Sequence, residues 1–313
     1  MKIFHYRNIS NTARHLANAQ KRLGHDAIVA DTVGRGDCDW IINKKKPGEV
    51  LRALMGFDLY HIHSGVFLPK GLEAIIAKVR GKKILYHHWG SDLRRGRKHY
   101  FDPDKPKPPR LQNLGDHVVH SPDLLEYIPD AYLVFTPIDL EVWREPASAY
   151  DSSKKDSVIR ILHAPLFEAQ TDDVQLAVKG TKYVHDAVTQ LKREGYNIES
   201  ITARNIPHNE MMKLYLQADI VVDQLILGWY GMTTIEAMTQ LKPVCVYVKE
   251  DLLKYTMEPT PFVNCTPQTI KDNLRYFIEN EVERRRIGEL GRRYVEEKHD
   301  ANKVVQKIMK LIE

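Results

Sequence analysis

The segment DIVVDQLILGWYGMTTIEAMTQLKPVCVYV (219–248) decides the fold. Its first seven residues, DIVVDQL, have an apolar centre typical of a buried strand, and VCVYV at its end is a second apolar run. Between them, two glycines flank an aromatic pair, and residues 233–241 have the pattern of a short helix that carries one acid, Glu236. A strand, a turn, a helix and another strand form the repeating unit of a parallel α/β sheet.

The same alternation runs along the whole chain of 313 residues. The run PASAYDSSKKDS (146–157) is small and polar without periodicity, which is typical of a linker. We therefore expect an α/β protein with two domains, 1–145 and 158–295, and a C-terminal helix over 296–313. The last 30 residues have a charged helical pattern that is interrupted near Gly288 and Gly291. Strands are expected at 2–6, 26–32, 58–64, 82–88, 116–121, 131–137 and 158–164.

Composition and cysteine content narrow the class of protein. Hydrophobic residues make up 43% of the chain and charged residues 28%, as in globular proteins. Apolar runs are too short for a spanning helix, and polar residues follow Met1 too early for a signal peptide. Cys38, Cys245 and Cys265 are widely spaced, which argues against disulfides and zinc and favours a cytoplasmic location.

Positive charge is concentrated in the first half of the chain. Residues 1–150 hold 23 lysines and arginines against 17 acids, with the excess at LRRGRKHY (93–100) and KPKPPR (105–110). One interpretation is a solvated basic face. The other is attraction to a polyanionic acceptor or to an anionic membrane, which would place the protein at the inner face of the membrane. No nucleic-acid-binding motif accompanies the charge, so we expect no nucleic-acid partner.

Glu236 has two interpretations. The run Thr233-Thr234-Ile235-Glu236 fits a capping box, in which the acid reaches back to a backbone N–H at the start of the helix. Alternatively, a carboxylate in the first turn of a helix after a strand accepts hydrogen bonds from the two hydroxyls of a ribose, while the helix N-terminus attracts phosphate.

Several segments, in the right order, resemble the GT-B glycosyltransferases, specifically the retaining group called family 4. Residues 218–244 are similar to the donor signature of that family, a Gly-aromatic-Gly turn followed by EAM and GKPV. The other similar segments are NTARHLANAQKRLGHDA (11–27), DLYHIHSG (58–65), HHWGSDLR (87–94), VKGTKYVHDAV (178–188) and RRYVEEKHDANKVV (292–305). The resemblance implies two Rossmann-like domains facing across a cleft, with the C-terminal helix crossing back to the first domain.

On the donor side, the resemblance implies that Glu236 binds the nucleotide ribose and that Lys179 neutralises the diphosphate. Independently, a cation beside a helix N-terminus is well placed to stabilise a pyrophosphate leaving group. The alternative for Lys179 is an ordinary solvated lysine. The expected nucleotide-sugar site consists of Lys179, Gly180, Asn205, Gly231, Met232, Thr233 and Glu236.

On the acceptor side, the family has a histidine that approaches the transferred sugar, and we match it to His88, as a third catalytic residue beside Lys179 and Glu236. Because Trp89 intervenes before the following glycine, His87 is an alternative, and both histidines would otherwise simply pack at the strand end. Asp92 and Arg94 either pair with each other or meet the acceptor. The expected acceptor-side residues are Asn8, Asn11, His87, Asp92 and Arg94.

Two departures from the family pattern stand out. In the family, another acid stands eight positions before the one that matches Glu236, but that position is Gly228 here. Asp223 replaces it only if the intervening loop folds back. The arginine that precedes the family lysine is also missing, and Arg204 or His163 is a candidate to supply the charge.

Metal and cofactor motifs are weak. DCD (37–39) and DPD (102–104) occur without a convincing strand end before them, and the histidines lack zinc-site spacing, so we expect no metal and no cofactor. His61 and His63 alternate on a predicted strand and share one face, where they line a cleft or pack. A dinucleotide fingerprint and a hydrolase elbow are both absent from the sequence.

The resemblance therefore implies an enzyme that transfers a sugar from a UDP- or GDP-linked donor to an acceptor hydroxyl, with retention and without a metal, in glycan or polysaccharide biosynthesis. The acceptor is a glycan, a lipid-linked molecule or a protein. One alternative is a catalytically impaired protein that only binds nucleotide sugars, as the missing acid suggests. Another is a sugar-nucleotide epimerase or a phosphorylase of the same architecture.

Overall fold

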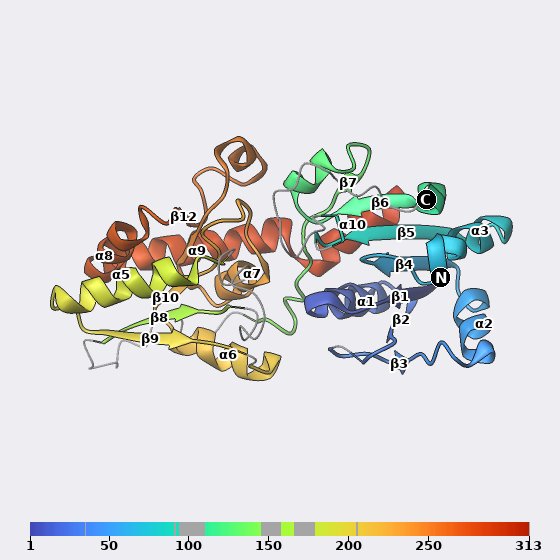
Figure 1. The fold of residues 1–313 in the computed structure, drawn as a ribbon, viewed down its shortest axis with the longest axis horizontal. Coiled ribbons are helices and arrows are strands. Elements are labelled where there is room, and N and C mark those ends of the chain that lie inside the picture. The colour runs from blue at the N-terminus through green and yellow to red at the C-terminus, as the bar shows by residue number, and fades with distance from the viewer. Residues whose placement is uncertain are drawn as a thin grey trace. The chain divides into compact units, whose positions relative to one another are not determined.

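The computed structural model describes residues 1–34, 36–90, 92–93, 110–144, 158–165, 179–204 and 206–312. The chain divides into two compact units: Met1–Asp139 with Lys298–Glu313, and Leu140–Glu297 (Figure 1). The predicted linker and most of the basic stretches 93–100 and 105–110 lie outside the described residues.

The first unit is built on a seven-stranded parallel sheet in the order β3-β2-β1-β4-β5-β6-β7. The order reverses between β1 and β4, and ligands of open α/β sheets bind at the carboxyl ends of the strands at such a point. The strands are β1 (Lys2–Tyr6), β2 (Asp26–Asp31), β3 (Trp40–Ile41), β4 (Leu59–His63), β5 (Lys83–His88), β6 (Asp116–Val119) and β7 (Tyr132–Leu133).

Helices cover both faces of this sheet. Alternation along β1 sends Ile3 into a core with α1 (Thr12–Arg22) and α10 (Ala301–Leu311), and sends Phe4 into a core with α2 (Pro47–Met55) and α3 (Leu72–Val79). Val304 and Ile308 of α10 are buried in the first of these cores. The predicted return of the C-terminal helix to the first unit is therefore confirmed.

The second unit has a five-stranded parallel sheet in the order β12-β11-β10-β8-β9. Its strands are β8 (Ile159–His163), β9 (Ile198–Thr202), β10 (Ile220–Val222), β11 (Val244–Val246) and β12 (Val263–Asn264). Its helices are α5 (Thr181–Arg193), α6 (His208–Gln217), α7 (Met232–Thr239), α8 (Ile270–Glu279) and α9 (Glu281–Lys298). The predicted α/β class with two parallel sheets is confirmed.

Helix α9 corrects one expectation. The predicted interruption near Gly288 and Gly291 is wrong, because α9 continues without a break from Glu281 to Lys298. Gly291 serves close packing instead: a Cβ at this position would lie 2.8 Å from Cγ of Met238. Among the described residues, no helix is both long enough and apolar enough to cross a bilayer.

Candidate functional site

The carboxyl ends of β8 and β10 bring the predicted donor residues together within the second unit. The two strands are paired in parallel, with His163 opposite Val222, so Asp223 follows directly at this edge of the sheet. Lys179 and Gly180 precede α5, and Gly231 precedes α7. Gly180 has φ +70°, and a Cβ there would lie 2.9 Å from Cβ of Leu225, so this turn favours glycine.

Asp223 is the centre of a buried polar cluster. Its side chain accepts a hydrogen bond from Nζ of Lys179 at 2.5 Å, from Oγ1 of Thr234 at 2.8 Å and from the backbone N–H of Gly231 at 3.0 Å. Burial alone would raise the pKa of Asp223, but the Lys179 charge and these hydrogen bonds outweigh burial and lower that pKa. The loop after β10 does fold back, so Asp223 links Gly231, at the start of α7, to Lys179 through hydrogen bonds.

Glu236 does not form the capping box. The N-cap of α7 is Gly231, so Thr233 and Glu236 both lie inside the helix. The carboxylate is buried and accepts a hydrogen bond from the Tyr215 hydroxyl at 2.8 Å. Burial and the neighbouring Glu236 charge raise the pKa of Tyr215, which keeps the hydroxyl a donor. The capping-box interpretation is therefore wrong.

Thr233 links the lysine to the glutamate. Nζ of Lys179 lies 3.4 Å from Oγ1 of Thr233, and Thr233 also interacts with the Tyr215 hydroxyl that holds Glu236. Because Thr233 and Glu236 are three positions apart, they share one face of α7. Lys179 and Glu236 thus belong to one cluster, together with Gly180, Gly231 and Met232, whereas Asn205 lies outside the described residues.

The sequence offers His163 and Arg204 as sources of the positive charge that the missing arginine would supply. His163 is buried between the carbonyl oxygen of Val222 and Oγ1 of Thr181, and burial lowers its pKa to about 4. It is neutral at neutral pH and supplies no positive charge to a diphosphate. Arg204 is solvent-exposed after β9, and none of the hydrogen bonds in the cluster involves it.

Gly228 is held in a conformation that disfavours an acid. It has φ +89°, and a Cβ there would lie 2.7 Å from Cγ of Lys249. We expect Gly228→Asp to lower the free energy of unfolding by about 1–3 kcal/mol without raising any transfer rate. Gly195→Asp is the matched control for urea denaturation, because Gly195 also has positive φ (+98°) but no atom within 4 Å of its Cβ position. Equal losses in the two variants would contradict the clash with Lys249.

In the first unit, the predicted acceptor-side residues lie at the carboxyl ends of β1 and β5. Asn8 follows β1, and its Nδ2 donates to Oδ1 of Asn11 at 2.9 Å. His88 ends β5, and its ring contacts Oδ2 of Asp92 at 2.6 Å and Nδ1 of His117 at 2.9 Å.

The partner of Asp92 in the structure is His88. Burial opposes ionisation of Asp92, but the hydrogen bond with His88, the His88 charge and backbone hydrogen bonds together outweigh burial and lower the pKa of this carboxyl. Arg94, the partner that the sequence suggested, lies outside the described residues.

A directed chain of hydrogen bonds links four side chains: that of Trp89, which follows β5, and those of His63, His5 and Gln20. Nε1 of Trp89 donates to Nδ1 of His63 at 3.1 Å, so neutral His63 carries its proton on Nε2. That nitrogen lies 3.0 Å from Nδ1 of His5, whose Nε2 in turn lies 2.6 Å from Oε1 of Gln20. Burial lowers the pKa of His5 to about 4 and that of His63 well below its usual value, so both imidazoles stay neutral.

His5, His61 and His63 also have the arrangement of a potential metal site, with one nitrogen from each lying within 4.8 Å of the others. However, a metal on Nε2 of His63 would move the proton to Nδ1, where it would face the indole N–H of Trp89. The hydrogen bonds thus favour packing over metal binding. The prediction that His61 and His63 share one face is confirmed, since their ring centroids lie 4.2 Å apart.

His87 is as deeply buried as these three imidazoles. Its Nδ1 lies 3.2 Å from Nε2 of His61, and its ring stacks on that of Trp89 with ring centroids 4.1 Å apart. Nδ1 of His61 and Nε2 of His87 are buried without a hydrogen-bond partner among the described residues. Sequence reasoning found the individual histidines but not their association.

Comparison with known proteins gives a match to one family model and a shared fold. Residues 152–294 match the family model described as glycosyl transferases group 1. No curated protein sequence matches the chain significantly. Three solved structures are similar over 97–100% of both chains: Anabaena HepE in complex with UDP (13% identity, 99% of this chain and 99% of that one, TM-score 0.65), a Rickettsia africae glycosyltransferase (15%, 99% and 97%, 0.66), and the catalytic domain of Arabidopsis thaliana starch synthase IV bound to ADP and acarbose (12%, 100% and 98%, 0.62).

Proposed function

We propose that this chain, a glycosyltransferase with the GT-B fold, transfers a sugar from a nucleoside diphosphate sugar to an acceptor hydroxyl. The proposal includes retention of anomeric configuration, as in family 4, and no essential metal. A UDP- or GDP-linked donor, a glycan, lipid-linked or protein acceptor, and a role in cytoplasmic polysaccharide biosynthesis complete it. The observation that carries the proposal is the cluster of Lys179, Asp223, Thr233 and Glu236 at the strand ends of the second unit.

The cluster has the chemistry to hold a diphosphate. Asp223 compensates most of the Lys179 charge, so the pair alone attracts an anion only weakly. The N-termini of α5 and α7 add partial positive charge next to it. Among the described residues, two of the three protons of the lysine ammonium have partners, Asp223 and Thr233, which leaves one to donate to a departing phosphate oxygen.

Glu236 has the chemistry to hold a ribose. A carboxylate accepts several hydrogen bonds, and one of those that Glu236 accepts comes from the Tyr215 hydroxyl. Tyr215 is fully buried, so it fixes the orientation of the carboxylate before any ligand arrives. Two vicinal hydroxyls then find an acceptor that is already in place, and this lowers the entropic cost of binding.

We expect Glu236→Gln to weaken binding of the nucleoside diphosphate about tenfold to hundredfold, since hydrogen bonds to a charged acceptor contribute about 1.5–3 kcal/mol. Isothermal titration calorimetry with UDP and GDP measures the loss. Glu289→Gln is the control, because Glu289 is exposed on α9 in the same unit. Unchanged affinity in Glu236→Gln would contradict the assignment of Glu236 as the residue that binds the ribose.

A panel of nucleoside diphosphate sugars, with product stereochemistry determined by NMR, tests the reaction itself. Retention with release of free nucleoside diphosphate supports the proposal, and an inverted product refutes its stereochemistry. A changed sugar nucleotide or a sugar phosphate would indicate an epimerase or a phosphorylase. Donor binding without turnover would indicate a catalytically impaired binding protein, the alternative that glycine at position 228 favours.

A further inference from the structure

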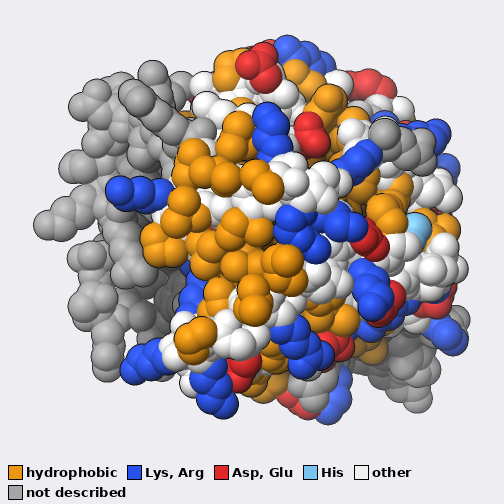
Figure 2. Space-filling view, turned by 90° about the vertical axis from the view of Figure 1, so that its right-hand side faces the viewer, with side chains coloured by type: hydrophobic (Ala, Val, Ile, Leu, Met, Phe, Trp, Pro, Cys, Tyr) orange, Lys and Arg blue, Asp and Glu red, His pale blue; other side chains and the backbone are white. Residues whose placement is uncertain are grey.

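Two helices of the first unit expose a row of large apolar side chains. On α3, Leu72, Ile75 and Val79 are 44%, 39% and 82% exposed, and their spacing places them on one face of the helix. On the neighbouring α2, Leu51 and Met55, one turn apart, are 60% and 48% exposed. Figure 2 views the end of this unit where α2, α3 and both termini lie, and hydrophobic side chains gather there among Lys and Arg. We call these five side chains and the surrounding lysines and arginines the α2–α3 face.

Lysine and arginine predominate in the segment that forms this face. Residues 44–83 hold nine lysines and arginines against three acids. Each of these acids is engaged locally: Glu49 pairs with Lys46, Asp58 pairs with Lys82, and buried Glu73 accepts the backbone N–H groups of 67 and 68. The excess positive charge is therefore not compensated within the segment.

The two helices are fixed to each other, so the apolar row is preformed. Arg80, directly after α3, donates from Nη1 to the carbonyl oxygen of Leu54 at 2.7 Å and from Nη2 to that of Met55 at 2.9 Å. These bonds satisfy carbonyl groups at the C-terminal end of α2 and hold it beside the end of α3. Binding of a partner to these helices therefore does not carry the entropic cost of ordering them first.

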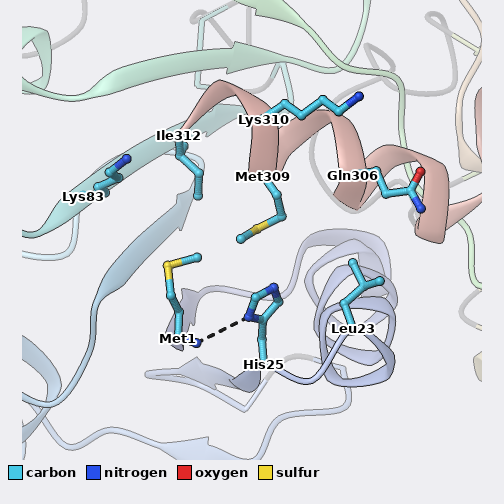
Figure 3. Close-up of a pocket in the computed structure, with 8 residues that line it drawn as sticks. All are labelled: Met1, Leu23, His25, Lys83, Gln306, Met309, Lys310 and Ile312. Carbon is cyan, nitrogen blue, oxygen red and sulfur yellow. Dashed lines mark hydrogen bonds between the residues drawn. The ribbon is translucent and has the colours of Figure 1, made fainter.

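Two open hollows extend the face along the amino ends of the strands. One, of about 270 Å³, is lined by Lys78, Lys82 and Lys83, by one acid, Asp116, and by residues without charge. The other, of about 640 Å³, shares Lys83 and Ile312 with it. In the larger hollow the side chains of Met1, Met309 and Ile312 point toward the open space (Figure 3). Both hollows combine apolar side chains with lysines, and this combination suits the acyl chains and the phosphate groups of lipids.

We propose that the α2–α3 face binds the surface of an anionic phospholipid bilayer, with Leu51, Ile75 and Val79 inserted at the interface and the lysines on lipid phosphates. Each lysine or arginine near such a surface contributes about 1 kcal/mol of attraction, and the apolar side chains add the hydrophobic term. A second copy of the chain fits less well, because a symmetric contact would bring two positively charged faces together.

This binding is independent of the sugar-transfer chemistry proposed above. The hollows lie at the amino ends of the strands, whereas Asn8 follows the carboxyl end of β1 and His88 is the last residue of β5. The surface also differs from the basic stretches 93–100 and 105–110 from which the sequence suggested membrane attraction.

Vesicle co-sedimentation of the full chain tests the proposal. We expect binding to vesicles of equal parts phosphatidylcholine and phosphatidylglycerol, no binding to phosphatidylcholine alone, and weakening with added salt. Val79→Glu and Lys78→Glu are each expected to reduce the partition coefficient about tenfold or more. Val282→Glu is the matched control, because Val282 on α9 is also 82% exposed. We expect it to bind like the unmodified protein.

The opposite outcomes overturn the proposal. The proposal is wrong if the wild-type protein does not bind anionic vesicles, or if the Val79→Glu and Lys78→Glu variants bind as well as wild type. An equal loss of binding in Val282→Glu would also contradict it. Analytical ultracentrifugation without lipid addresses the competing partner: a dimer that dissociates in Val79→Glu would make this face a contact between copies. Calorimetry with UDP and GDP on the same variants separates the two proposals, since nucleotide binding is expected to be unchanged when vesicle binding is lost.

Discussion

Lowering the pH from 7 to 5 is expected to destabilise the first unit steeply, because its interior contains neutral imidazoles. Burial lowers the pKa of His5, His117 and His299 to about 4, and lowers that of His61 and His87 well below the usual 6.5. Between about pH 6.5 and 4 the unfolded chain binds protons at these positions and the folded chain does not. Stability therefore falls as the pH falls through this window, by about 1.4 kcal/mol per pH unit for each imidazole.

Few imidazoles are needed for a large effect. Two of them together lower the free energy of unfolding by about 4 kcal/mol between pH 7 and pH 5, which is close to the whole stability of a marginal domain. His61 and His87 are the most sensitive, because each already has a buried nitrogen without a hydrogen-bond partner among the described residues. A proton there would add an uncompensated charge.

Urea denaturation at a series of pH values, followed by tryptophan fluorescence, measures the proton uptake as the slope of unfolding free energy against pH. We expect a slope of several protons near pH 5.5. His87→Phe is expected to reduce it by about one proton. His185→Phe in the second unit serves as the control. A flat profile between pH 7 and 5 would mean that the histidine cluster relaxes or is hydrated in solution.

The histidine cluster also shows where prediction of the structure from the sequence stops. Alternation within the run DLYHIHS placed His61 and His63 on one face, because strand periodicity is local. The pairing of His5 with His61 and of His63 with His87 depends on β4 lying between β1 and β5. Strand order is a long-range property, so the sequence contains these imidazoles without showing that they meet.

The donor cluster divides in a similar way. The segment around Glu236 and the KGT turn were predictable from local patterns and from resemblance. The two-residue strands β3 and β12 were not, since two residues carry no periodicity. The roles of Asp223 and Tyr215 required coordinates: one depends on how the loop after β10 folds back, and the other on α6 packing beside α7.

Lys179→Ala is expected to lower kcat/KM for sugar transfer about 10²–10³-fold, which is the usual cost of removing one preorganised group that stabilises developing charge. The same substitution leaves the carboxylate of Asp223, which is fully buried, without its cation. An unpaired buried charge of this kind costs about 3–5 kcal/mol of stability. Activity with the donor panel and urea denaturation must therefore be measured together.

The double variant Lys179→Met with Asp223→Asn separates the two effects. It removes both charges, so no buried ion is left unpaired, while the amide oxygen introduced at position 223 still accepts from Gly231 or Thr234. We expect stability to recover by most of the loss, since replacing both members of a buried ion pair is often nearly neutral. Activity is expected to stay about 10²–10³-fold low, because the ammonium that would meet the leaving diphosphate is still absent. If activity returned along with stability, Lys179 would serve only to neutralise Asp223, and the diphosphate would have to be held by the helix N-termini alone.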